Sequence, residues 1–304
     1  MAKKAKSSPG IDGILLIDKP SGWTSHDVVA RSRRLTGQRR IGHTGTLDPM
    51  ATGLLVLCLG RATRLVEYMT GHDKRYIGHI RLGEATDTDD ADGRVIARSP
   101  VPPLTSVALE AIAREFTGSL LQRPPAYSAV KIEGQRAYAA ARAGKDLDLP
   151  PRPVTVHRLS LEQLEPQLLA ITVECGAGTY VRSLARDIGD RLGCGAHLAS
   201  LRRTHVGGFD VGVALTLDSL EQIAEAGRLD SVLRAADEGV VDFDAAIVRV
   251  ERGALLRHGI VLDGVVPAAR AAEFARIYDS LGDFLAIGSV GPSGDVRALK
   301  VLQT

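Results

Sequence analysis

The sequence predicts an α+β fold in which a mixed, largely antiparallel central sheet is flanked by helices. Strand-like runs alternate irregularly with helical ones, and no internal repeat is present. The run LLVLCLG, residues 54–60, is short and fully apolar, which is typical of a buried strand. With 304 residues, 44% of them hydrophobic and 24% charged, the chain has an ordinary globular composition and can form one large domain and one small domain.

The N-terminal half is expected to begin with a strand at 14–20 and a helix at 25–37, which Ser25 could cap and Gly37 could end. Hydrophobic patterning then predicts a strand at 54–60, a helix at 61–70 and a strand at 75–83. A further helix is predicted at 104–118, where Val107, Ile112 and Phe116 lie roughly on one side.

The C-terminal half is expected to contain a strand pair, 153–164 and 167–176, and then an amphipathic helix at 179–193 that starts directly after the turn of Gly176 and Gly178. From about residue 240, a short helix at 252–259 precedes β-like runs at 277–290 and 295–302. These last elements are typical of a separate small, β-rich domain.

The composition of the connecting segments predicts the domain organisation. Residues 133–153 carry a helix and then a charged, Pro-rich loop, a composition that forms a core poorly. The predicted parts are a disordered basic tail at 1–9, a main domain at 10–235 with a mobile insertion at about 124–153, and a C-terminal domain at 236–304.

The segment GHTGTLDP, residues 42–49, is the most informative stretch of the chain. Gly42 and Gly45 permit positive φ or a close backbone approach, and Pro49 biases Asp48 toward an extended conformation. The strand that follows would anchor this loop to a rigid core, so the carboxylate of Asp48 could be aimed at a substrate. The alternative is a tight turn closed by an Asx-type hydrogen bond.

The basic residues are unevenly distributed although the net charge is only +2. They gather in the N-terminal tail and just before the Asp48 loop, at Lys3, Lys4, Lys6, Arg31, Arg33, Arg34, Arg39 and Arg40. A basic cluster beside a candidate active site suggests a polyanionic substrate, because phosphate neutralisation supplies much of nucleic-acid affinity. The alternative is an ordinary solvated helix face.

Several other classes of site lack support in the sequence. Cys58, Cys175 and Cys194 form no CxxC pair, so neither a disulfide framework nor a zinc site is suggested, and a cytoplasmic location fits. No phosphate loop or complete dinucleotide fingerprint is present, and no apolar run reaches the roughly 18 residues of a membrane span. The acidic run with Asp87, Asp89, Asp90 and Asp92 fails the register of a calcium loop and is interpreted as a solvated turn.

Six motifs follow one another along residues 10–210. They are ILLIDKPSGWTSHDVVAR (14–31), GHTGTLDPMATGLLVLCLGRATRL (42–65), KRYIGHIRLGEATDTDDADG (74–93), RPPAYSAVKIEGQRAY (123–138), GTYVRSLARDIG (178–189) and LRRTHVGGF (201–209). Together they closely resemble the TruB family of tRNA pseudouridine synthases. The resemblance implies the pseudouridine synthase fold and, for residues 236–304, a PUA-like RNA-binding domain.

The resemblance carries the catalytic nucleophile onto Asp48. It places Arg182 as the cation that pairs with this aspartate, and Tyr76 as the tyrosine that stacks on the target base and can exchange a proton. Without the family, Arg182 could be a helix-surface arginine and Tyr76 an ordinary strand aromatic. Both the acylal and the glycal route remain open.

Further roles implied by the resemblance concern RNA binding. Tyr180 and Leu201 match positions that line the uracil pocket, and His43 matches the residue that inserts where the target base was extruded. The KPxGxTS signature that starts at Lys19 is interpreted as mainly structural, although Lys19 could also touch phosphate. Arg39 and Arg40 are assigned to salt-dependent RNA binding.

The implied reaction is conversion of uridine to pseudouridine at position 55 in the T-loop of tRNA, by a monomer without metal or organic cofactor. An isomerisation has no net redox change, and a base must leave the stack to be modified. Two rival classes remain: a non-catalytic RNA-binding protein, and an unrelated hydrolase with an aspartate nucleophile, which would need metal ligands or a second positioned carboxylate.

Overall fold

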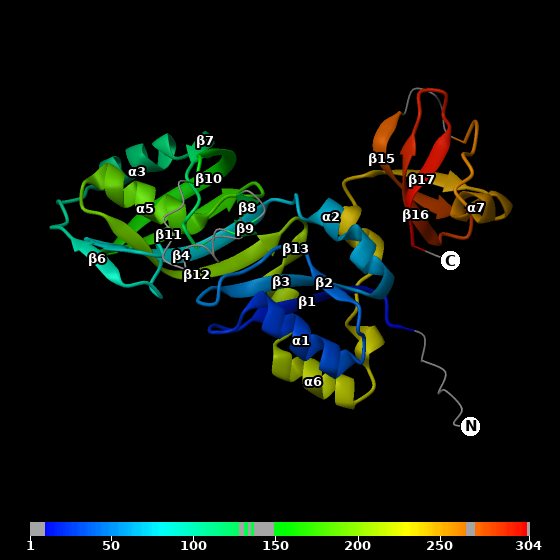
Figure 1. Ribbon diagram of the computed structural model, residues 1–304, viewed down its shortest axis with the longest axis horizontal. Helices are drawn as coiled ribbons and strands as arrows, with labels where there is room; N and C mark the ends of the chain where they lie inside the picture. Colours follow the sequence, from blue (N-terminus) through cyan, green and yellow to red (C-terminus); the bar gives the residue numbers. More distant parts are fainter. Residues whose placement is uncertain (1–9, 128–130, 133–134, 137–148, 266–270, 303–304) are drawn as a thin grey trace.

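The computed structural model describes residues 10–127, 131–132, 135–136, 149–265 and 271–302 (Figure 1). The predicted tail at 1–9 and most of the predicted insertion at 124–153 therefore lie outside the described residues.

One nine-stranded sheet forms the centre of the main domain, and its class agrees with the prediction. Every pair of neighbouring strands in it is antiparallel except β3 and β12, which run parallel. The order is β1 (Gly13–Lys19), β3 (Thr52–Leu59), β12 (Ala196–Val206), β4 (Lys74–Leu82), β11 (Leu168–Cys175), β10 (Arg152–Glu165) and β7 (Gly118–Gln122), with β2 (Ile41–His43) on β3 and β13 (Phe209–Asp210) on β12. Two hairpins lie outside it: β5 (Glu84–Thr86) with β6 (Val95–Arg98), and β8 (Lys131–Ile132) with β9 (Gln135–Arg136).

The sheet has two lobes, each with its own helices (Figure 1). In the first lobe, α1 (Ser25–Thr36) and α6 (Leu217–Glu225) pack on the face of β1 and β3 that carries Leu55 and Leu57. The opposite face, with Leu54 and Val56, packs on η1 (Gly60–Leu65) and α2 (Val66–Met69). Burial on both faces explains why the predicted strand at 54–60 is apolar throughout.

The second lobe consists of β12, β4, β11, β10 and β7. Its core is formed with α3 (Ser106–Glu115) and α5 (Val181–Leu192). Ile112 is buried and Phe116 is partly buried against this core, whereas Val107 is 70% exposed, so the three residues do not share one buried side as predicted. The structure also adds η2 (Val211–Val213), η3 (Leu229–Ser231) and η4 (Ala236–Val240) after the sheet.

The two lobes join where β3 and β12 pair in parallel over only two residue pairs, Arg202 with Thr52 and Arg203 with Gly53. Gly53 has a φ of 99°, and a Cβ there would lie 2.3 Å from the carbonyl oxygen of Arg203. Only glycine permits this approach. Neither Gly42 nor Gly45 has a positive φ, and a Cβ at either position would meet its nearest atom at 3.5 Å, an ordinary contact distance, so the glycine that this region requires is Gly53.

The start of α1 corrects a sequence prediction. Thr24, not Ser25, is the N-cap: its side chain accepts from the backbone N–H of Asp27, and the Asp27 carboxylate accepts from the backbone N–H of Thr24. Gly37 ends the helix in the left-handed conformation, as predicted. Ser25 is thereby left for another role, which is described below.

A second, four-stranded sheet follows the main domain, in the order β14 (Asp244–Val248), β15 (Ala272–Asp279), β16 (Phe284–Val290) and β17 (Val296–Val301), with α7 (Val250–Arg257) against it. It contacts α2 through an aromatic cluster in which the ring of Tyr68 lies 5.9 Å from that of Phe243 and 5.3 Å from that of Phe274. A β-rich C-terminal part was predicted from the sequence; the boundary at 236 and the likeness to a PUA domain stay predictions. Several elements were not predicted from the sequence, among them β7, the central strand β12, α6 and β14.

Candidate active site

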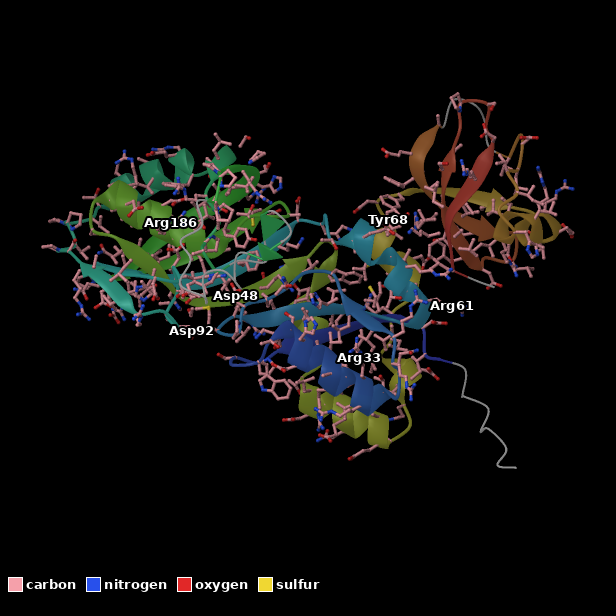
Figure 2. The ribbon with its side chains drawn as sticks, in the orientation of Figure 1. Arg33, Asp48, Arg61, Tyr68, Asp92 and Arg186 are labelled. Carbon is pink, nitrogen blue, oxygen red and sulfur yellow. The ribbon has the colours of Figure 1, made fainter. Side chains whose placement is uncertain are left out.

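Residues 44–51, which we call the Asp48 loop, connect β2 to β3 at the junction of the two lobes (Figure 2). Backbone bonds close the loop at both ends, from Thr44 N to Val56 O (3.2 Å) and from Ala51 N to Asp48 O (3.1 Å). The hydroxyl of Ser25 on α1 is 2.9 Å from Leu47 N and 3.2 Å from Leu47 O, so it accepts from one and donates to the other. The first helix thus fixes the middle of the loop.

Lys19 lies beneath the loop and is fully buried, with 0% exposure. Its ammonium group donates to the carbonyl oxygens of Pro20 (2.9 Å), Trp23 (2.7 Å) and Pro49 (3.2 Å). Burial lowers the pKa of Lys19 to about 8. Because all three donors bind carbonyls, the geometry favours the structural interpretation of the KPxGxTS signature over contact of Lys19 with phosphate.

Arg203 on β12 holds the loop from the other lobe, and the sequence analysis gave it no role. Its buried guanidinium donates to the carbonyl oxygens of Leu54 (2.7 Å) and Gly45 (3.0 Å) and lies 3.5 Å from that of Thr46. The only signal in the sequence was its place in the LRRTHVGGF motif. That motif does not say which carbonyls a buried arginine will meet.

Arg182 forms a two-point ion pair with Asp48, as the resemblance implied. Its Nη2 lies 3.2 Å from Asp48 Oδ1, and its Nε lies 3.0 Å from Oδ2. The guanidinium is buried and also donates to the carbonyl oxygens of Thr88 and Tyr127, each at 3.0 Å. The alternative of a helix-surface arginine is therefore excluded by the geometry.

The acidic run 87–92 is not a solvated turn, and this prediction is wrong. Asp90 is only 4% exposed, and its Oδ2 lies 3.2 Å from Nη1 of Arg182. Asp89 pairs with Arg186 at 2.8 Å. Backbone bonds from Leu198 N to Asp89 O and from Ala91 N to Leu198 O, both 3.0 Å, attach the turn to β12. Arg182 therefore joins two carboxylates, Asp48 and Asp90.

The pKa of Asp48 is raised above its ordinary value of 3.8. Burial is the largest cause, and the nearby negative charge of Asp90 acts in the same direction. The positive charge and hydrogen bond of Arg182 oppose the shift, and Lys19 opposes it more weakly. Arg182 thus limits a shift that burial imposes, while its bonds orient the carboxylate.

A cavity of about 360 Å³ opens beside Asp48 and brings together the other residues expected to meet the base. Tyr76 on β4, Leu201 on β12 and Tyr180 at the start of α5 all line it. The backbone of Tyr180 is held by Gln122, through bonds of 2.8 Å and 3.0 Å. Ligand pockets typically have volumes of about 300–1,000 Å³, so this cavity is at the small end of that range and suits a single small ring system.

The phenol of Tyr76 is buried near the guanidinium of Arg203. Burial raises the pKa of Tyr76 above 10.0, and the charge of Arg203 opposes that rise. The group is consequently protonated at neutral pH and can donate a hydrogen bond into the cavity.

His43, Arg39 and Arg40 do not line this cavity. The ring of His43 lies edge-on to that of His26, with centroids 6.3 Å apart, and burial lowers the pKa of His43. The carbonyl of Arg40 accepts from Gly60 N (2.8 Å), which follows the end of β3 that is farther from Asp48. Figure 2 shows the separation between Asp48 and Arg61, the neighbour of Gly60. These arginines therefore lie outside the cavity beside Asp48, and their role in RNA binding stays a prediction.

Two family models cover most of the main domain. The N-terminal domain of TruB family pseudouridylate synthases matches residues 33–181, and the tRNA pseudouridylate synthase B C-terminal domain matches residues 182–241. The tRNA pseudouridine synthase B of Stutzerimonas stutzeri is 38% identical over the full length of both chains. The chain belongs to the TruB family. It is therefore an enzyme of pseudouridine formation.

Other relatives agree with this assignment. The tRNA pseudouridine synthase B of Leifsonia xyli subsp. xyli is 56% identical over 70% of this chain and 72% of its own. Among solved structures, a Cbf5–Nop10–Gar1 complex contains a chain with a TM-score of 0.74 and 25% identity, covering 96% of this chain and 85% of that one. The family membership confirms the pseudouridine synthase fold that the motifs implied.

Two kinds of feature are absent from the residues that the structure describes. They contain no cluster of three or more His, Cys, Asp or Glu side chains arranged to hold a metal ion. None of the helices in the described ranges is long and apolar enough to cross a membrane.

Proposed function

We propose that this enzyme converts uridine to pseudouridine at position 55 in the T-loop of tRNA, with Asp48 as nucleophile. The observation that carries the proposal is the Asp48 carboxylate, held at 3.0 and 3.2 Å by buried Arg182 at the edge of a cavity that tyrosine rings and an apolar leucine line. Relatives at 38% and 56% identity are named tRNA pseudouridine synthase B, which supports tRNA as the substrate.

The reaction conserves every atom of the nucleoside. The bond between N1 and C1′ breaks, the uracil turns within the cavity, a bond from C5 to C1′ forms, the proton on C5 leaves and N1 gains a proton. A carboxylate suits this sequence because it can attack C1′ or C6, or stabilise positive charge that develops on the sugar. Either route requires Asp48 to be ionised when the base enters.

Arg182 and Tyr76 divide the supporting tasks. Arg182 keeps the Asp48 carboxylate oriented and favours its charged form. Tyr76 is protonated at neutral pH, so its phenol acts as a donor to the base and as a stacking surface, rather than as a phenolate base. Leu201 and Tyr180 complete the pocket that holds a base taken out of its stack.

RNA binding is assigned to residues outside the cavity. T-loop bases are accessible because they lie in a single-stranded loop. We assign His43, on the strand that leads into the Asp48 loop, to the gap left by the extruded base. Exposed Arg39 and Arg40, near the end of β3 that is farther from Asp48, provide phosphate contacts outside the cavity.

The hydrolase alternative is disfavoured by the position of Asp90. A retaining or inverting glycosidase needs a second carboxyl group facing the substrate. Asp90 Oδ2 faces Arg182, and Asp90 Oδ1 accepts from the Thr88 hydroxyl and from Asp92 N. Asp90 does not line the cavity, so it is not placed to act as a general acid there.

The test of this function is release of tritium from C5 of uridine in unmodified tRNA transcripts, because attachment through C5 expels that hydrogen. Wild-type enzyme should release one equivalent per tRNA. Replacing the T-loop uridine by cytidine should abolish the release, whereas replacing another loop uridine should not. Release that persists after the T-loop change would refute the assigned position, and no release from any transcript would refute the activity on tRNA.

A further inference from the structure

A second cavity, of about 690 Å³, lies on the other side of the Asp48 loop, and the proposed chemistry does not use it. We call it the α1–α6 groove, and its walls are the end of β1, the turn before α1, the outer side of α1 and the start of α6. Residues that line the groove also contact the Asp48 loop or adjoin the junction beneath it. Lys19 lines the groove and binds Pro49 O, and Thr52 and Arg202 in the groove adjoin the Gly53–Arg203 junction.

Most charged side chains in the groove are already paired. Arg202 donates to both oxygens of Asp18, at 2.9 and 2.7 Å, and Arg31 pairs with Glu221 on α6 at 2.6 Å. These pairs fix the walls and leave little net charge there. Asp218, in the first turn of α6, is the exposed acid of the groove, and the helix N-terminus offsets its charge.

Two groups in the groove have no partner among the residues that the structure describes. Trp23, the only tryptophan of the chain, is 36% exposed, and neither its ring nor its indole N–H contacts another aromatic ring or acceptor there. Arg34 is exposed and makes no ion pair or hydrogen bond within the same described ranges. An exposed tryptophan and a free guanidinium in one groove have the chemistry that binds a base and a phosphate.

The spacing of these two groups suits an extended strand. Arg34 lies nine residues after Ser25, the first residue of α1, so it is about 14 Å along the helix from the turn that carries Trp23. At a rise of about 3.4 Å for each stacked nucleotide, this distance accommodates several nucleotides. Trp23 is at the end nearest the Asp48 loop, because its carbonyl and that of Pro49 both bind Lys19.

We propose that the α1–α6 groove binds an unpaired stretch of the substrate RNA that continues past the target nucleotide, with one base stacked on Trp23 and one phosphate on Arg34. The inference rests on the proposed function for the identity of the RNA. The groove then acts as an anchor for the strand, while the cavity beside Asp48 receives the extruded base.

Trp23 is also the probe that tests the proposal. Tryptophan emission of the wild-type enzyme is titrated with unmodified tRNA transcript and, separately, with heparin, a polyanion without bases. Stacking predicts that RNA changes the emission saturably and heparin does not. Unchanged emission at saturating RNA, or an equal change with heparin, would overturn the stacked base.

Binding of labelled tRNA then assigns the two contacts. Trp23→Ala should raise Kd roughly tenfold, and Trp23→Phe, which keeps an aromatic ring, should recover most of the affinity. Arg34→Gln should reduce the slope of log K against log salt by about one, whereas the matched control Arg114→Gln, an exposed arginine on α3, should leave it unchanged. Wild-type affinity for Trp23→Ala and an unchanged slope for Arg34→Gln would refute the site.

Turnover separates this proposal from the assigned activity. All four variants should release C5 tritium with wild-type kcat when tRNA is saturating, because none alters the cavity beside Asp48. A loss of kcat in Trp23→Phe or Arg34→Gln would contradict a pure anchoring role. Absence of tritium release from the wild type itself would refute the proposed function. The emission and binding results would then still show whether the groove binds RNA.

Discussion

The two sides of the Asp48 loop differ in what they provide. On one side, Arg182 bonds the Asp48 carboxylate and shares its charge with Asp90. On the other, Lys19 and Arg203 are also buried, and both donate to backbone carbonyls rather than to the Asp48 carboxylate. The comparison teaches that one side sets the charge of the carboxylate and the other sets its position.

The largest effect is expected at the carboxylate itself. Asp48→Asn removes the nucleophile but keeps its shape, so turnover should fall by about 10⁴-fold or more. The melting temperature should stay equal or rise, since burial disfavours the ionised side chain at neutral pH. Tritium release and thermal unfolding check the two parts, and near-normal turnover would remove Asp48 from the reaction.

Substitutions of the two buried arginines, Arg182 and Arg203, should have different effects on turnover and stability. Arg182→Met should lower kcat by about 10²–10³-fold and destabilise the fold by about 3 kcal/mol, because Asp90 would be left buried without its cation. Arg203→Met leaves loop carbonyls unpaired, so the loss should appear mainly as stability, with turnover partly restored by Arg203→Lys. Denaturant unfolding and single-turnover rates separate these outcomes. Equal losses of rate and of stability in the two variants would contradict the different roles assigned to Arg182 and Arg203.

The ionisation of Asp48 should make both turnover and stability depend on pH. Because the pKa of Asp48 is raised above 3.8, turnover should fall as the pH decreases through that raised value. Stability has the opposite sign: the folded state holds this proton more tightly than the unfolded chain, so the contribution is present below pH 3.8 and is lost as the pH rises through the folded pKa. The free energy of unfolding of Asp48→Asn relative to wild type should therefore increase with pH across this window. A constant difference would mean that the pKa is not raised.

The smallest effect is expected at Ser25. Ser25→Ala leaves Leu47 N and Leu47 O without their partner, which should cost about 1–2 kcal/mol. Turnover should fall only several-fold, because Lys19 and Arg203 still hold the loop. Ser106, the first residue of α3, gives a matched control as Ser106→Ala. Equal stability losses for the two variants would show that the Ser25 bond to the loop is not special.

Elements whose pattern is local were predictable from the sequence. The apolar run at 54–60 and the turn glycines around the amphipathic helix at 179–193 encode β3 and α5 directly. The helix α6 and the strands β12 and β14 were missed. In β12, AHLASLRRTHV, polar and charged residues interrupt the apolar ones, so this central strand has no apolar run that marks it as buried.

Contacts between distant parts of the chain were less predictable. Asp90 is buried only because Arg182, 92 residues later, meets it, so an acidic run looked solvated. Arg203 looked like any strand arginine until the parallel pairing with Gly53 placed it under the loop. Arg39 and Arg40 precede Asp48 closely in sequence, yet β2 runs between them and the loop. Asp48, Arg182 and Tyr76 were found through the family motifs, not through pattern alone.

The most direct test of the account is a single-turnover measurement of C5-tritium release with enzyme in excess of tRNA, comparing wild type with Asp48→Asn after the Kd of each has been measured. The account predicts equal tRNA affinity within about threefold and release by the variant at background level. Release by Asp48→Asn within tenfold of the wild-type rate would contradict the central role of this carboxylate.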